Sequence, residues 1–144
     1  MIFPYVKGLS EEVRQVLNNL NLDILYTVPN RLNGIIKNVV YKINCKDCAA
    51  CYIGQTKRHL EKRIKEHRNN IKRHESNYSV ISNHRISYNH DFDWEFVSIL
   101  HNEINIKKRE IVEMIFIKKQ NNAINLQRDT DNLNPIYNTI IDSL

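Results

Sequence analysis

The pattern that decides the fold lies in residues 39–56, VVYKINCKDCAACYIGQT. Residues 39–43 are rich in β-branched and aromatic side chains and predict a strand. The cysteine cluster that follows predicts a turn, and Cys51, Tyr52 and Ile53 predict a second strand that ends at Gly54. Two strands this close in the chain are expected to pair as an antiparallel hairpin with an elaborated loop.

The hairpin is followed by a helix, a strand and a second helix. Residues 58–74 carry apolar residues at helical spacing, at Leu60, Ile64 and Ile71, and predict the first helix. The polar residues 75–91 predict a loop, and residues 94–100 a third strand. Residues 105–119 predict the second helix. Its expected core side carries Ile111, Met114 and Ile115.

The chain divides into a preamble and one domain. Residues 1–37 are expected to be an N-terminal connector, with a short accessory helix from Ser10 to Asn21 and a brief strand over residues 22–28. Residues 38–144 are expected to form the functional domain, with an irregular C-terminal tail. The order of elements predicts an α+β fold, a small three-stranded antiparallel sheet flanked by helices.

Composition excludes several classes of protein. Hydrophobic residues make up 42% of the 144-residue chain, which argues against a disordered protein. No apolar run approaches the roughly 18 residues that a membrane span requires, so no membrane partner is expected. The first residues lack the pattern of a secretory signal, so the three cysteines are expected to be reduced thiols or metal ligands.

Positive charge is concentrated in one stretch. The net charge is +5, and residues 57–73 hold eight lysines and arginines against two glutamates. Such a stripe is typical of nucleic-acid binding, although a solvated helix face would look the same. The residues expected to contact DNA are Gln55, Thr56, Lys57, Arg58, Lys62, Lys65, Arg68, Lys72 and Arg73.

A set of polar residues could hydrolyse a phosphodiester bond: Tyr41, Tyr52, Arg63, His67, Glu113 and Asn125. Arg63 can grip phosphate oxygens, and Glu113 can hold a Mg²⁺ ion that keeps most of its waters. Tyr41 could take a proton from water only if its pKa were lowered by the cation and Arg63. Each residue alone is more often structural, so the weight of the set rests on its spacing.

That spacing resembles the GIY-YIG nuclease superfamily. The matching segments are VVY (39–41), YIGQT (52–56), RIKEH (63–67), EMIFIKK (113–119) and Asn125. The resemblance implies that Tyr41 acts as general base or water-positioning group beside Tyr52, and that His67 orients or assists it. It also implies that Arg63 stabilises charge on the phosphate, that Glu113 binds Mg²⁺ or Mn²⁺, and that Asn125 positions Glu113 or the substrate.

The match has one departure and one competing residue. Val39 stands where the name-giving glycine of the first motif is usual, which puts the close packing of the first strand in doubt. Glu110 competes with Glu113 for the metal-binding role. The residues after Glu113 and its distance to Asn125 fit the pattern of the family that the chain resembles, so the resemblance favours Glu113.

The cysteines resemble those of the Penelope-like retroelement branch, which carries a C-x-x-C insertion and two downstream histidines. Here these are Cys45, Cys48, His84 and His90. The resemblance implies a structural Cys₂His₂ zinc site that staples the hairpin loop to the loop before the third strand. Cys51 is left over, and it could replace Cys48 as a ligand. The alternative is free thiols and surface histidines.

The function implied is a Mg²⁺-dependent DNA endonuclease that nicks target DNA to prime reverse transcription. Its expected location is the nucleus, and its expected partners are DNA, a reverse transcriptase domain and element RNA. The alternative is a catalytically inactive, zinc-stabilised nucleic-acid-binding module. A protein-interaction domain would leave the polar constellation unexplained.

Overall fold

The computed structural model describes residues 2–4, 25–28, 35–72 and 78–142. The predicted accessory helix at residues 10–21 lies outside the described residues. The strands are β1 (Ile2–Pro4), β2 (Leu25–Val28), β3 (Val39–Asn44), β4 (Cys51–Thr56) and β5 (Val97–Asn102). The helices are α2 (Leu60–Asn69), η1 (Asn70–Lys72), α3 (Val80–Tyr88), α4 (Ile106–Lys119), η3 (Gln127–Thr130) and α5 (Ile136–Asp142).

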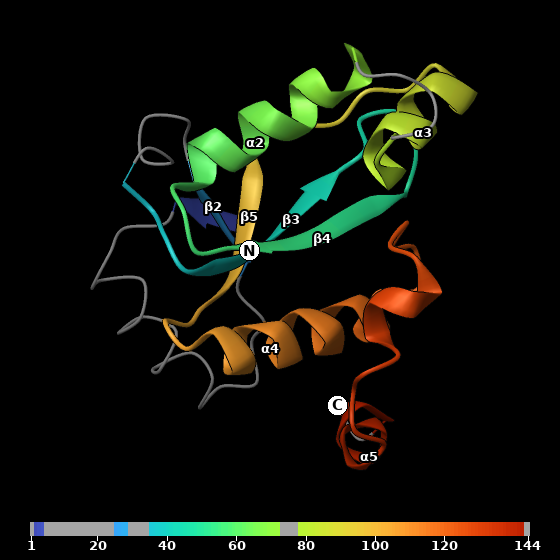
Figure 1. The fold of residues 1–144 in the computed structure, drawn as a ribbon. Helices are drawn as coiled ribbons and strands as arrows, with labels where there is room; N and C mark the ends of the chain where they lie inside the picture. Colours follow the sequence, from blue (N-terminus) through green and yellow to red (C-terminus); the bar gives the residue numbers. More distant parts are fainter. Residues whose placement is uncertain (1, 5–24, 29–34, 73–77, 143–144) are drawn as a thin grey trace.

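The predicted α+β fold is confirmed, with β3 antiparallel to both β4 and β5. Two further strands extend this three-stranded unit, giving the order β1-β2-β5-β3-β4. β2 pairs antiparallel with β5, and β1 pairs parallel with β2. The segment expected to be a connector therefore supplies strands to the same sheet. Helices α2 and α3 cover one face of the sheet and α4 covers the other (Figure 1).

Burial on both faces explains the near-continuous apolar run of β3. Val39, Tyr41 and Ile43 join the core cluster that contains Leu60 and Ile64 of α2. Val40 points the other way and packs with residues of β4, β5 and α4. Val39 is 1% exposed. A valine in place of the usual glycine is therefore accommodated in the core.

Several predicted boundaries and faces need correction. β4 continues past Gly54 to Thr56, and β5 begins at Val97, so Trp94 precedes it. The first helix is shorter than predicted, with α2 passing into the 3-10 turn η1. The residues of α4 that pack on the sheet include Val112, Phe116 and Ile117, not the three predicted. Arg109 and Glu113 share that inner side and interrupt its apolar pattern, which obscured the packed face.

Residues 75–91 were predicted to be a loop, and that prediction is wrong for α3. Ser79 caps α3 by accepting a hydrogen bond from the Ser82 backbone, and Asn89 ends it in the left-handed conformation, with φ of 53°. Polar residues fill most of α3, so only its caps mark it in the sequence. The tail was predicted to be irregular but contains η3 and α5. No helix among the described residues is long and apolar enough to cross a membrane.

The free edge of β4 is partly covered by the segment after α4. The backbone of Cys51 bonds to Asn122 and Ile124. The side chain of Asn125 then accepts a hydrogen bond from the Ile53 amide at 3.0 Å and donates one to the Ile53 carbonyl at 2.8 Å. Asn125 therefore pairs with β4 as a further strand residue would.

We expect Asn125→Ala to lower the free energy of unfolding by about 1–3 kcal/mol, because both backbone groups of Ile53 lose their partner. Urea unfolding measured beside Asn121→Ala, an exposed neighbour, would check this. If the two substitutions lowered the free energy of unfolding equally, the stabilising role of the Asn125 bonds to Ile53 would be contradicted.

Candidate active site and metal-binding cluster

The phenol of Tyr41 is fully buried and lies against Gly54 of the neighbouring strand. A Cβ atom at position 54 would stand 2.7 Å from the Tyr41 hydroxyl and 2.8 Å from the Tyr52 ring. The pairing of β3 with β5 also shifts register between Val40 and Tyr41, as a β-bulge does. The glycine of YIG therefore makes room for the tyrosine of the first motif.

His67 of α2 reaches down to this phenol. Its Nε2 lies 2.8 Å from the Tyr41 hydroxyl, and the residue is 3% exposed. Burial, and then the charge of Arg63, lower the pKa of His67 to about 3, so the imidazole is neutral at physiological pH. Its Nδ1 is buried without a partner among the described residues.

The state of the Tyr41 hydroxyl decides where the imidazole proton lies. While Tyr41 is protonated, its O–H can donate to Nε2 of His67, and the imidazole proton then lies on Nδ1. A phenolate can only accept, so with Tyr41 ionised the proton belongs on Nε2, which donates to the phenolate oxygen. A donor at this position stabilises the phenolate form of Tyr41.

Burial nevertheless raises the pKa of Tyr41 well above its usual value of 10, and the neighbouring Tyr52 adds to this. Arg63 opposes the rise through its charge and hydrogen bonding. Burial likewise raises the pKa of Tyr52, again against the effect of Arg63. Tyr52 packs edge-on against His67, with ring centroids 5.1 Å apart. Without a further cation, both tyrosines stay protonated.

Arg63 of α2 is the partly exposed cation of this cluster. Its guanidinium lies 3.2 Å from the Glu66 carboxylate, which also binds Arg58 through two hydrogen bonds of 2.7 and 2.9 Å. The Arg63 side chain is 33% exposed, so it can still reach a substrate. Exposed pairs of this kind contribute little stability, so breaking one to bind a substrate costs little.

Glu113 approaches the same cluster from α4, on the opposite face of the sheet. Burial, and then the negative charge of Asp129, raise its pKa to about 7, while Arg63 lowers it. Its charge in turn raises the pKa values of Tyr41 and Tyr52. The competing Glu110 lies 3.9 Å from Lys107, in an exposed pair. The side chains from α2 and α4 therefore converge at the edge strand β4.

Asn125 lies beside this cluster but bonds to the backbone of Ile53. Its contact in the structure is with the strand, so it positions β4. Two residues missed in the sequence also belong here, Arg109 and Asp129. Arg109 is four residues before Glu113, so helical periodicity was the available signal for it.

The predicted DNA-contacting residues lie in different settings. Thr56 is buried, and its hydroxyl accepts a hydrogen bond from the Arg58 amide at 3.1 Å, which orders the turn into α2. Gln55 accepts a hydrogen bond from Arg109. The side chain of Lys72 and the whole of Arg73 lie outside the described residues. The remaining members, Lys57, Arg58, Lys62, Lys65 and Arg68, are exposed on or just before α2.

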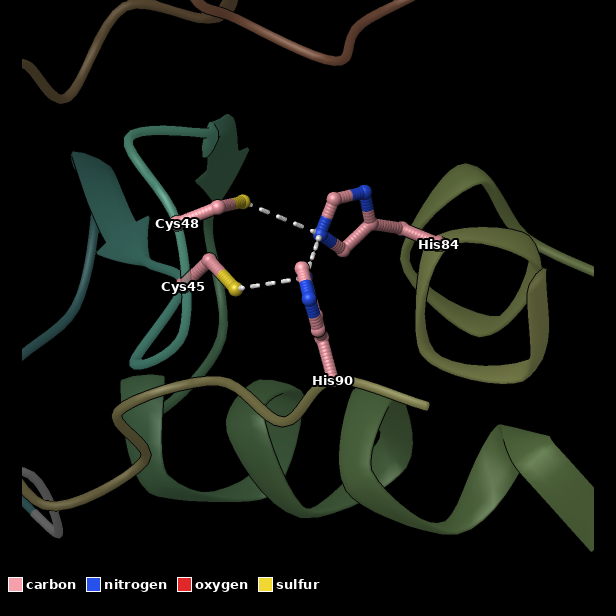
Figure 2. A group of neighbouring side chains, drawn as sticks. All are labelled: Cys45, Cys48, His84 and His90. Atoms are coloured by element: carbon pink, nitrogen blue, oxygen red, sulfur yellow. Dashed lines mark hydrogen bonds between the residues drawn. The ribbon is translucent and has the colours of Figure 1, made fainter. Parts of the chain in front are cut away.

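The predicted zinc ligands come together in space (Figure 2). Cys45 Sγ lies 3.6 Å from His90 Nδ1, Cys48 Sγ lies 3.5 Å from His84 Nε2, and the two nitrogens are 3.3 Å apart. In a tetrahedral zinc site the Zn–S bonds are about 2.3 Å long and the Zn–N bonds about 2.0 Å. These bond lengths place a sulfur and a nitrogen about 3.5 Å apart, and two nitrogens about 3.3 Å apart. The four donors therefore match the shape of a tetrahedral site.

The cluster joins two segments that are far apart in sequence. Both cysteines lie in the β3–β4 loop, His84 lies on α3 and His90 follows it. Backbone amides of Asp47 and Ala50 face the two sulfurs at 3.4 and 3.5 Å, an arrangement that favours thiolates. Cys51 is buried beside Asn122 instead. The alternative in which Cys51 replaces Cys48 is therefore not the arrangement found.

Comparison with known families agrees with this geometry. The GIY-YIG catalytic domain matches residues 37–126, which is more than half of the chain. The chain belongs to the GIY-YIG family. No curated protein and no solved structure matches it significantly. The GIY-YIG domain implies a nuclease that acts on DNA and uses a divalent metal. The Cys₂His₂ cluster is a second group that could bind metal.

The raised pKa of Glu113 predicts a pH-dependent cost to the metal-free nuclease fold. The pKa of Glu113 in the folded protein, about 7, exceeds its ordinary value of 4.5. The favourable contribution of the protonated Glu113 side chain to stability is therefore fully present below pH 4.5 and is lost as the pH rises through 7. We expect Glu113→Gln to raise the free energy of unfolding by about 1–3 kcal/mol at pH 8, and by less at pH 5.5.

Urea unfolding in buffer without Mg²⁺ measures this difference, with Glu110→Gln on the same helix as the control. Added Mg²⁺ should then stabilise the wild type and not Glu113→Gln. A Glu113→Gln protein that is less stable than the wild type at pH 8 would contradict the assignment.

Proposed function

We propose that this GIY-YIG protein is a Mg²⁺-dependent DNA endonuclease that nicks target DNA. The observation that carries the proposal is the 2.8 Å contact between buried Tyr41 and neutral His67, with Arg63 and Glu113 converging on it. Phosphodiester hydrolysis needs a base for water, a cation on the phosphate and a metal ligand. This cluster has one residue for each.

The Tyr41 phenol first gives its own proton to solvent, and its phenolate then takes a proton from the attacking water. The water oxygen bonds to phosphorus as the bond from phosphorus to the leaving oxygen breaks, and that oxygen takes up a proton from solvent. His67 supports that phenolate through Nε2–H, and Arg63 supports it through its charge. Arg63 also binds a phosphate oxygen and balances the negative charge that grows on phosphorus. Tyr52 fills the space beside His67 and excludes water from the imidazole.

Glu113 suits Mg²⁺, because a single partly buried carboxylate together with a substrate phosphate is a usual ligand set for this ion. When bound, Mg²⁺ (or Mn²⁺) would supply positive charge that lowers the pKa of nearby acids and neutralises the phosphate. The raised pKa of Glu113 is that expected of a carboxylate held in place for a cation.

We further propose that the Cys₂His₂ cluster holds Zn²⁺ as a structural ion. Its four donors leave no open position, which is typical of structural rather than catalytic zinc. The C-x-x-C loop with its two histidines supports a relationship to Penelope-like retroelement nucleases. In that setting the nick would prime reverse transcription in the nucleus, with a reverse transcriptase domain and element RNA as partners.

Supercoiled-plasmid nicking tests the catalytic proposal. We expect the wild type to nick in Mg²⁺ and not in EDTA, and Glu113→Ala and Tyr41→Phe each to slow nicking by about 10²-fold or more. Glu110→Ala on the same helix is the matched control and should retain activity. A wild type that binds DNA without cutting it, in Mn²⁺ as well, would favour the inactive binding module.

Metal analysis tests the zinc site separately. We expect about one zinc ion per chain in the wild type, and none in Cys48→Ser or His84→Ala, because each loses one of four ligands. Cys51→Ser is the control and should keep its zinc. Unfolding of the wild type at lower temperature after chelation would confirm a structural role, and zinc retained by Cys48→Ser would refute the assignment.

A further inference from the structure

An open pocket of about 340 Å³ lies next to Arg63, beside the residues used in the proposed mechanism. Four cationic side chains line it, those of Lys57, Arg58, Arg63 and Arg109, together with polar Gln55 and apolar Ile106. None of the described lining residues carries a carboxylate. Glu66, outside the lining, pairs with Arg58 and Arg63, whereas Lys57 and Arg109 have no such ion pair among the described residues. The positive charge that remains around this hollow favours a bound anion.

Arg109 is the least expected of these residues, because it is only 2% exposed. Its Nε donates to the Gln55 side chain at 2.7 Å, and one terminal nitrogen donates to the Glu103 carbonyl at 2.8 Å. Both acceptors are neutral oxygens. Among the described residues no carboxylate lies within ion-pair distance of Arg109. The charge of Arg109 lowers the pKa of Glu113, but the two side chains form no ion pair. A buried guanidinium without a close counter-ion is costly, and a bound anion would supply one.

The backbone beside Arg109 is also open. Cys51 and Ile53 have their outward backbone groups bonded to residues 122–125. Outward groups recur every second residue along a strand, so those of Gln55 come next on the same edge. The described covering segment bonds Cys51 and Ile53, and the pocket lies at Gln55. An amide donor therefore adds to the cations around this hollow.

We propose that this pocket binds the DNA phosphate that neighbours the scissile phosphate, with Arg109 as its buried anchor and Lys57 at its mouth. Arg63 lines both the pocket and the tyrosine cluster, so a strand could place consecutive phosphates on its two sides. Gln55 holds the Arg109 fork in position. The choice of a DNA phosphate rests on the proposed nuclease function, whereas the anion-binding pocket does not.

Binding in EDTA tests the pocket without requiring cleavage. The probe is thymidine 3′,5′-bisphosphate, measured by calorimetry, with uncharged thymidine as the comparison ligand. We expect Lys57→Ala and Arg109→Lys each to weaken bisphosphate binding by about tenfold or more. Lys57→Ala removes a charge-assisted contact, and Arg109→Lys keeps the charge but loses the planar guanidinium that binds two oxygens at once. Lys119→Ala, an exposed lysine at the far end of α4, is the matched control and should bind as the wild type does.

Lys57→Ala keeps the test decisive if Arg109→Lys fails to fold, because Lys57 is exposed. With a duplex oligonucleotide, Lys57→Ala should also reduce the salt dependence of binding by about one counterion. Equal binding by Lys57→Ala and Lys119→Ala, or no bisphosphate binding by the wild type, would overturn the pocket. A wild type that binds the bisphosphate but nicks no plasmid would overturn the nuclease proposal alone.

Discussion

The close approach of the Tyr41 phenol to Gly54 is the constraint on which the site depends. β3 and β4 are adjacent strands, and a bulky phenol can lie over its neighbour only where that neighbour has no Cβ. Once the phenol lies there, α2 must pack so that His67 meets it at 2.8 Å. The sheet, the helix and the candidate base are thereby placed by one steric requirement. Val39 is buried in the core on the same face of the sheet as Tyr41.

The second feature is the polar inner side of α4. A helix that packs on a sheet normally presents only apolar residues, but here Arg109 and Glu113 lie among Val112, Phe116 and Ile117. Both residues are desolvated and neither is ion-paired among the described residues. Natural proteins accept such costs mainly at functional sites. The two charges face the β4 edge, where a metal ion and a phosphate would compensate them.

The Cys₂His₂ cluster lies in a separate part of the fold and joins the β3–β4 loop to α3 and the residues after it. The β3–β4 loop and α3 lie at one end of the sheet (Figure 1). Ile81 of α3, Phe92 and Trp94 are buried in the same core cluster as Cys45, and the Arg85 guanidinium lies 5.3 Å from the Trp94 ring centroid and 3.0 Å from Asp91. Four converging side chains that could bind metal would add a further link between these segments. The link lies at the opposite end of α2 from the pocket lined by Arg58.

Local patterns in the sequence were enough to predict the α+β class, the three antiparallel strands and α4, and a family resemblance in the cysteine and histidine spacing added the group Cys45, Cys48, His84 and His90, which could bind metal. Each depends on residue type and spacing along the chain, which are visible without coordinates. The helix α3 was missed because its only local signals are its caps, whereas the packed side of α4 and the bonding of Asn125 to Ile53 depend on contacts across the chain. Burial of Arg109 was also invisible in the sequence, because a helical arginine is ordinarily solvated. Only tertiary structure decides which side of a helix meets the sheet, and with it which charges lose their water.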